Sequence, residues 1–171
     1  MDPVTSTVTI DRPREEVFAY LADIANHAEF MTPLFDDWRL TREDSYGAGA
    51  GARFRAQGRM DRFGWGEMNF LEVDSPRRIV GVGRGGKYNR IKTYCEWNLE
   101  PAGQGATRVS FTFDTEPPLP TDKIVETLSG RRGWYKRGSK KALRALRSRL
   151  EEGRAKGART TVSGLYPSPR V

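Results

Sequence analysis

A strongly amphipathic segment near the C-terminal end of the chain constrains the fold more than any other feature. Residues 131–150 contain nine Lys and Arg, and at helical spacing most of these cations fall on one side. The opposite side carries a stripe of apolar residues, namely Ile124, Leu128, Tyr135, Ala142, Leu146 and Leu150. A free basic arm has no need of such a stripe, whereas a helix packed across a sheet does. The segment therefore predicts a long helix from about Thr121, with its apolar side buried and its cations in water.

The chain before this helix predicts an antiparallel sheet. Residues 4–10 alternate between two faces and are rich in β-branched side chains, which is typical of a half-buried strand. Six further strands, joined by short turns that contain Gly or Pro, are predicted at 36–43, 52–60, 65–74, 79–84, 88–100 and 107–116. Because short connections favour pairing between consecutive strands, the sequence predicts a sheet of about seven antiparallel strands.

Two short helices are predicted between the first and second strands. Asp11 is expected to cap the first helix, with Pro13 at an early helical position and acidic residues in the first turn. Asn26 is expected to cap the second helix over residues 27–31, which Pro33 ends. The predicted fold class is therefore α+β, with two short helices after the first strand and one long helix at the end.

Two glycines interrupt the predicted C-terminal helix. Gly130 and Gly133 each cost about 1 kcal/mol relative to Ala in a helix interior. They indicate a weak point or kink in the helix. Two interpretations follow, namely a flaw that solvent tolerates and a hinge that admits a ligand.

The positive charge of the chain is concentrated at its C-terminal end. The net charge is +7, and residues 131–171 hold 13 Lys and Arg against 2 Asp and Glu. This basic end has three interpretations: a solvated surface, docking on an anionic membrane, or binding to nucleic acid. Nucleic acid is the least favoured of the three, because no recognised nucleic-acid module accompanies the charge.

The composition indicates a globular domain over residues 1–152, followed by a basic, flexible tail over residues 153–171. The chain is 37% hydrophobic and 30% charged, which is typical of a globular protein. We see neither a run of about 18 apolar residues nor the basic and apolar regions of a signal peptide. Cys95 is the single cysteine, so an intrachain disulfide cannot form. These features lead us to expect a cytoplasmic protein.

Few residues favour a catalytic or metal centre. His27 is the only histidine, and we expect an exposed or capping role for it. Cys95 is expected to be a small core residue. One His and one Cys far apart provide no spacing for metal ligands, and we expect neither a metal nor a cofactor. The glycine-rich stretch 47–51 lacks the pattern of a phosphate-binding loop and precedes a strand, so it predicts a flexible turn.

Several segments together resemble one known superfamily. They are VTIDRPREEVFAYLADIANHAEF, YGAGAGARFRAQG, LEVDSPRRIVG, CEWNLEPAGQGATRVSFTF and KKALRALRSRLE. In this order the segments are similar to the SRPBCC superfamily, which has the START-like helix-grip fold, and most of all to its polyketide cyclase/dehydrase and lipid transport branch. The resemblance covers roughly residues 4–152. It implies that the sheet curves around the long helix.

The resemblance also implies a mostly apolar cavity between sheet and helix. The residues expected to face it are Phe54, Met68, Trp97, Phe111, Leu128 and Tyr135. Tyr135 is the one candidate proton donor on the helix stripe. Arg131, if it turns inward, would join Tyr135 in anchoring a hydroxyl, carbonyl or carboxylate of a ligand. These two residues are the only candidates that we assign to catalysis.

The fold does not decide the activity, because the superfamily includes carriers, receptors, cyclases, dehydratases and lipid-transfer proteins. The favoured hypothesis is binding or transport of a small hydrophobic ligand, such as a lipid, a quinone or a polyketide. The alternative is a polyketide aromatase/cyclase or dehydratase that acts in the same cavity. A third hypothesis is an interaction module that uses the basic tail. The residues leave open whether the protein is an enzyme.

Overall fold

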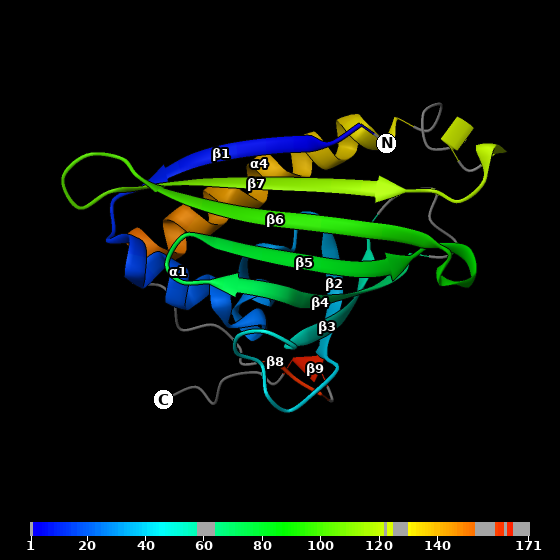
Figure 1. Cartoon of the computed structure of the whole chain (residues 1–171), viewed down its shortest axis with the longest axis horizontal. Coiled ribbons are helices and arrows are strands. Elements are labelled where there is room, and N and C mark those ends of the chain that lie inside the picture. Colours follow the sequence, from blue (N-terminus) through cyan, green and yellow to red (C-terminus); the bar gives the residue numbers. More distant parts are fainter. Residues whose placement is uncertain are drawn as a thin grey trace.

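The protein folds around one curved antiparallel sheet, which a long helix crosses (Figure 1). The computed structural model describes residues 2–57, 64–121, 123–124, 130–152, 160–162 and 164–165. Seven strands pair in the order β1-β7-β6-β5-β4-β3-β2, all antiparallel. Their bounds are β1 (Val4–Ile10), β2 (Phe35–Leu40), β3 (Gly51–Ala56), β4 (Trp65–Asp74), β5 (Arg78–Gly85), β6 (Ile91–Pro101) and β7 (Thr107–Glu116). The predicted seven-stranded sheet is confirmed.

The helices lie on the inner side of the sheet, in the positions that a helix-grip fold requires. The short helices after β1 are α1 (Arg14–Ala22), η1 (Ile24–Asn26) and α2 (His27–Phe30). The long helix is α4 (Arg131–Glu151), which packs against β1 and α2 and passes behind the sheet in Figure 1. A 3-10 turn, η2 (Lys87–Asn89), joins β5 to β6. Among the described helices, none is long and apolar enough to cross a membrane.

The core lies between the inner face of the sheet and α4. Along β7, Val109, Phe111 and Phe113 are buried while the residues between them are more exposed, as the alternation predicts. The inner side of α4 is buried at Tyr135, Gly138, Ser139, Ala142, Leu143, Leu146 and Leu150. The predicted division of this helix into a buried apolar side and an outward basic side is therefore confirmed. Burial of these side chains is the main force that holds α4 on the sheet.

The long helix begins later than its periodicity predicts. Residues 120–121 and 123–124 are helical, but Gly130 has φ of 66°, and α4 begins only at Arg131. A left-handed φ ends a right-handed helix, and glycine adopts it without the steric cost of a Cβ. The prediction of one helix from Thr121 is therefore wrong. Ile124, which was expected in the buried stripe, is 57% exposed.

The predicted capping roles are also corrected. Pro13 occupies the N-cap position of α1, and no side chain caps that helix. The backbone N–H of Asp11 instead donates to Glu151 Oε1 at 2.8 Å, and Arg12 Nε donates to the carbonyl of Leu150 at 3.0 Å. Asn26 precedes α2 without a capping bond from its side chain. The turn after β1 therefore binds the end of α4 and does not cap a helix, a partnership that local sequence cannot show.

The C-terminal tail lies partly outside the described residues. Residues 160–162 and 164–165 contain two short paired strands, β8 (Thr160–Thr161) and β9 (Gly164–Leu165), which lie beside β2 (Figure 1). Residues 153–159, 163 and 166–171 lie outside the described part. The division into a domain over 1–152 and a flexible tail over 153–171 stays a prediction.

Candidate functional site

A small pocket opens between the sheet and the first turn of α4. It lies at the end of the sheet where β4 begins at Trp65, β5 ends at Gly85, β6 begins at Ile91 and β7 ends at Glu116, which we call the open end. The register of the strands places these four residues at the same end of the sheet. Arg131 and Tyr135, one turn apart on α4, face the pocket from the other side.

Aromatic side chains form most of the pocket wall. Phe35 on β2 and Phe54 on β3 are neighbours across the strand pair, with ring centroids 4.3 Å apart. On the other side, Phe113 of β7 stacks on Tyr135 of α4, with centroids 4.6 Å apart. The stacked pair forms because Phe113 faces inward along β7 and Tyr135 lies on the buried side of α4. Such walls favour a flat, apolar ligand.

A few polar groups converge on this apolar wall. Thr93 on β6 and Thr115 on β7 are directly paired in the sheet, and both line the pocket. The hydroxyl of Thr93 is buried and has no hydrogen-bond partner among the described residues. A buried hydroxyl without a partner costs about 1–3 kcal/mol, so a ligand oxygen that binds it would gain affinity. Arg131 supplies a positive charge and Tyr135 a phenolic hydroxyl at the opposite wall.

Glycines on β4 and β5 let the wall form at this end. A Cβ on Gly66 would lie 3.1 Å from the ring of Phe54, and a Cβ on Gly83 would lie 2.9 Å from Thr93 Oγ1. The first contact is tighter than most Cβ contacts, so the Phe54 ring would have to shift. At Gly83 the backbone carbonyl oxygen of Glu67 would lie closer still, so a side chain does not fit there. Gly66 therefore lets Phe54 lie close to the backbone of β4, and Gly83 lets the backbones of β4 and β5 approach each other beside Thr93.

The pocket is small in this conformation. Its volume is about 40 Å³, which holds one or two water molecules. Pockets for small organic ligands usually measure about 300–1,000 Å³. A ligand larger than water therefore requires the aromatic walls to move apart.

A larger hollow of about 550 Å³ lies on the outer face of the sheet, but its surroundings are less suited to a hydrophobic ligand. Charges of both signs line it, and two of them, Lys92 and Glu116, already pair across β6 and β7 at 3.3 Å. Aromatic walls and converging polar groups distinguish ligand pockets better than volume does. We therefore take the inner pocket as the candidate site.

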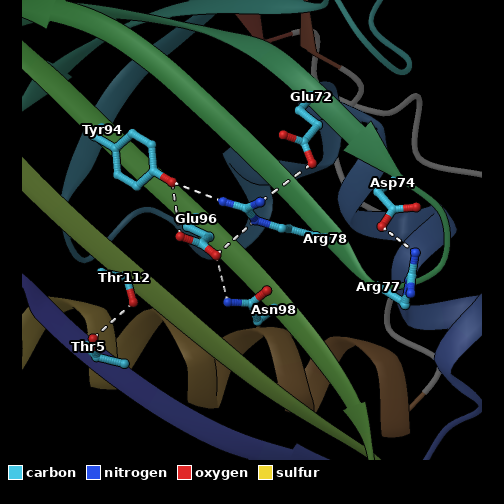
Figure 2. Close-up of polar contacts among 9 residues, drawn as sticks. All are labelled: Thr5, Glu72, Asp74, Arg77, Arg78, Tyr94, Glu96, Asn98 and Thr112. Atoms are coloured by element: carbon cyan, nitrogen blue, oxygen red, sulfur yellow. Dashed lines mark hydrogen bonds and ion pairs between the residues drawn. The ribbon is translucent and has the colours of Figure 1, made fainter.

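A polar network next to this outer hollow stabilises the sheet (Figure 2). Arg78 Nε donates to Glu96 Oε1 at 2.9 Å, and the Tyr94 hydroxyl donates to Glu96 Oε2 at 3.0 Å. Asn98 donates to the same carboxylate at 2.8 Å. Burial raises the pKa of Glu96, but these three donors outweigh it and lower that pKa below its usual value. The network pairs charges across β5 and β6 and needs no ligand.

The structure brings together only part of the predicted site. Phe54, Tyr135 and Arg131 line the pocket. Three other predicted residues are buried in the core and do not line it, namely Met68, Trp97 and Phe111. Leu128 lies outside the described residues. The ligand-binding and catalytic roles of all these residues stay predictions.

Sequence reasoning did not select several residues that line the pocket. Phe113 follows Phe111 in the same inward alternation, and Thr93 lies on the same face of β6 as Trp97. The alternation places both residues inward, but it does not show at which end of the strands the pocket opens. Phe35 was missed because β2 begins one residue before its predicted start.

The expected exposed or capping role of His27 is wrong. Its side chain is 1% exposed, and Nε2 donates to the carbonyl of Leu21 at 2.8 Å. Four rings surround it at centroid distances of 5.1–6.0 Å, namely Phe30, Trp38, Phe70 and Trp97. Burial lowers the pKa of His27 to about 4. His27 is a neutral core residue outside the pocket, because aromatic packing of its short helix against the sheet buries it.

The other reactive groups fit structural roles. Cys95 is buried, and its Sγ lies 3.1 Å from Met68 Sδ. Burial raises the pKa of the Cys95 thiol to about 12, so the thiolate is not available at neutral pH. Within the described part of the chain, no group of His, Cys, Asp and Glu side chains is placed to hold a metal ion.

Comparison with known proteins assigns this arrangement to a family. The family described as polyketide cyclase / dehydrase and lipid transport matches residues 1–151. The chain belongs to this family. The resemblance to the SRPBCC superfamily and its helix-grip fold is thereby confirmed. No curated protein matches its sequence.

Solved structures show the same fold at low sequence identity. TTHA0849 from Thermus thermophilus is 18% identical, with a TM-score of 0.64 over 88% of this chain and 98% of that chain. A START superfamily protein from Mycobacterium smegmatis is 13% identical, with a TM-score of 0.61 over 88% and 97%. Norcoclaurine synthase from Thalictrum flavum, in complex with dopamine and hydroxybenzaldehyde, is 13% identical, with a TM-score of 0.62 over 88% and 87%. These likenesses concern the fold of this family member and leave its ligand open.

Proposed function

We propose that the protein binds or transports a small hydrophobic ligand, such as a lipid, a quinone or a polyketide-like molecule, at the open end. The observation that carries the proposal is the unpartnered Thr93 hydroxyl among the aromatic walls of the inner pocket. A ligand with a flat apolar body and one oxygen at its end would satisfy both features. We also propose that the protein is cytoplasmic and meets an anionic membrane through its basic C-terminal helix and tail.

The position of Arg131 adds to the ligand chemistry. Its guanidinium group is always charged and presents several N–H donors. Together with Tyr135, which lines the same pocket, Arg131 favours a carbonyl, enolate or carboxylate at the polar end of the ligand. Norcoclaurine synthase, which shares the fold, was solved with dopamine and hydroxybenzaldehyde. Each of those molecules joins an aromatic ring to oxygen groups, the same combination that the pocket favours here.

Calorimetric titration with 1-naphthol tests the proposal, because this probe joins a flat ring system to one hydroxyl. We expect Thr93→Val to weaken binding by about fivefold to tenfold, since one neutral hydrogen bond contributes about 1 kcal/mol. Thr112→Val is the matched control, because Thr112 bonds Thr5 on the outer face of the sheet. Equal affinity of both variants and the unchanged protein would remove Thr93 from the site. Native mass spectrometry that finds no co-purifying apolar molecule, together with no naphthol binding, would contradict the proposed function.

One observation favours the enzymatic alternative, a polyketide aromatase/cyclase or dehydratase. Tyr135 and Arg131 face the same pocket from adjacent turns of α4. A phenol can donate a proton to a carbonyl oxygen, and a nearby guanidinium can stabilise the resulting anion. Turnover of a poly-β-keto substrate that is lost in Tyr135→Phe would support this role. Binding of the poly-β-keto substrate without turnover would instead indicate a carrier.

A further inference from the structure

Three exposed apolar side chains lie on segments that join or follow the strands at the open end. Tyr88 is 82% exposed, Leu119 is 45% exposed and Ile124 is 57% exposed. Tyr88 lies in the turn between β5 and β6, and Leu119 follows β7. Lys92 at the start of β6 pairs with Glu116 at the end of β7, so both segments leave the sheet at the same end (Figure 1). A single exposed apolar side chain is ordinary, so the inference depends on what accompanies these three at the same end of the sheet.

The backbone holds Tyr88 outward at a steric cost. Gly86, Tyr88 and Asn89 all have left-handed φ values, of 73°, 61° and 51°. Such values are unfavourable for residues other than glycine, and they concentrate at functional sites. Lys87 places its Nζ over the Tyr88 ring, 5.1 Å from the centroid. The tip of this turn thus presents an aromatic ring and a cation together, the combination found where proteins meet the membrane interface.

A row of cations on α4 begins at the same end. Six exposed side chains have no ion-pair partner among the described residues, namely Arg132, Lys136, Arg137, Lys140, Lys141 and Arg144. At 1.5 Å per residue this row is about 18 Å long. Further along α4 the charges are balanced, because Arg147 pairs with Glu151 at 2.9 Å and Arg149 approaches Glu29 at 3.9 Å. The unbalanced charge therefore lies in the half of α4 nearest the pocket.

We infer that the open end docks on a negatively charged lipid bilayer. The side chains of Tyr88, Leu119 and Ile124 enter the interface, and the unpaired cations of α4 bind lipid phosphates and carboxylates. The inference rests on the proposed function, because ligand binding gives the docking its purpose. Docking would turn the pocket mouth toward the membrane, so that an apolar ligand could pass between bilayer and pocket without crossing water. Nucleic acid would satisfy the cations but would leave the three apolar side chains without a role.

Co-sedimentation with vesicles tests the charged part of the surface. We expect binding to phosphatidylcholine vesicles that contain phosphatidylserine, and much weaker binding to phosphatidylcholine alone. Each basic residue near an anionic surface contributes about fivefold in affinity, so Lys136→Glu with Lys140→Glu should weaken binding by at least about 25-fold. The matched control reverses Arg42 and Arg108, which are exposed elsewhere. Equal losses in both double variants would show only a net-charge effect and would overturn the inference.

The apolar part needs a separate test. Tyr88→Ser should weaken binding to anionic vesicles even at high salt, where electrostatic attraction is screened. Leu71→Ser is the matched control, because Leu71 is 66% exposed on β4 but outside the open end. Tight binding of duplex DNA without vesicle binding would overturn the inference. Calorimetry with 1-naphthol in the absence of vesicles separates the two proposals: unchanged naphthol binding with no docking rejects only the membrane surface, and docking without naphthol binding rejects only the pocket.

Discussion

Replacement of Gly138 by alanine tests the close packing of α4 that closes the core. Gly138 lies inside α4 and is buried. A Cβ at this position would lie 2.8 Å from Leu34 Cγ and closer still to Leu34 Cδ2. Leu34 is 1% exposed, and Cγ is the branch point of its side chain, so the group has little room to move away. The added methyl group therefore overpacks this contact.

The expected magnitude is the difference between two opposing effects. Helix propensity favours alanine over glycine by about 1 kcal/mol in a helix interior. Overpacking of a tight core contact costs about 1–3 kcal/mol. Because the clash reaches a branch point, we expect the upper part of that range. Gly138→Ala should therefore lower the free energy of unfolding by about 1–2 kcal/mol, the opposite sign from helix propensity alone.

Urea unfolding followed by circular dichroism measures the effect, with Gly133→Ala as the matched control. A Cβ on Gly133 would be 3.5 Å from Arg137 Nη1, which is an ordinary contact. Gly133→Ala should therefore raise the free energy of unfolding by about 0.5–1 kcal/mol. In a Leu34→Ala background the clash is absent, and Gly138→Ala should become stabilising as well. Equal stabilisation by both glycine replacements in the unchanged background would refute the reasoning.

Three further predictions concern the buried titratable groups and the tail. Because the pKa of His27 is lowered to about 4 from 6.5, the unfolded chain takes up a proton first as pH falls. Stability is therefore full above pH 6.5 and falls by about 3 kcal/mol between pH 6.5 and 4; urea unfolding of His27→Gln should lose this slope, and an unchanged slope would contradict the assignment. Cys95, with a pKa of about 12 and a buried thiol, should react with a thiol reagent only after unfolding, so fast labelling of the native protein would contradict its burial. Removal of residues 153–171 should leave the circular dichroism spectrum of the sheet and α4 unchanged; loss of cooperative unfolding would show that the tail belongs to the domain.

Periodicity was sufficient for the elements that are buried on one side. The strands of residues 65–74 and 107–116 were predicted with their observed bounds. For 65–74 the flanking turns set the bounds, whereas for 107–116 alternation reports which face meets the core. The buried stripe of α4 was predicted for the same reason. Periodicity alone misplaced the start of this helix. The glycines at 130 and 133 indicated a weak point, but the sequence did not show that Gly130 takes a left-handed φ and that α4 begins only after it. Ile124 fits the angular position of the stripe, but it precedes Gly130 and therefore does not belong to the buried face of α4.

The amino-acid sequence by itself determined the α+β class, through the order of its predicted strands and helices. It also determined the burial of one side of α4 and the row of cations on the other side, because these depend only on the spacing of residue types along one helix. The tertiary structure alone decided where the pocket lies and what it contains. Thr93, Phe113 and Arg131 come from three separate elements, and strand register together with the position of α4 brings them to one end of the sheet. The same packing buries His27 among four rings, although nothing in its neighbouring residues marks it as a core residue. Local spacing specifies which face of an element is apolar, whereas contacts between distant elements specify which side chains meet.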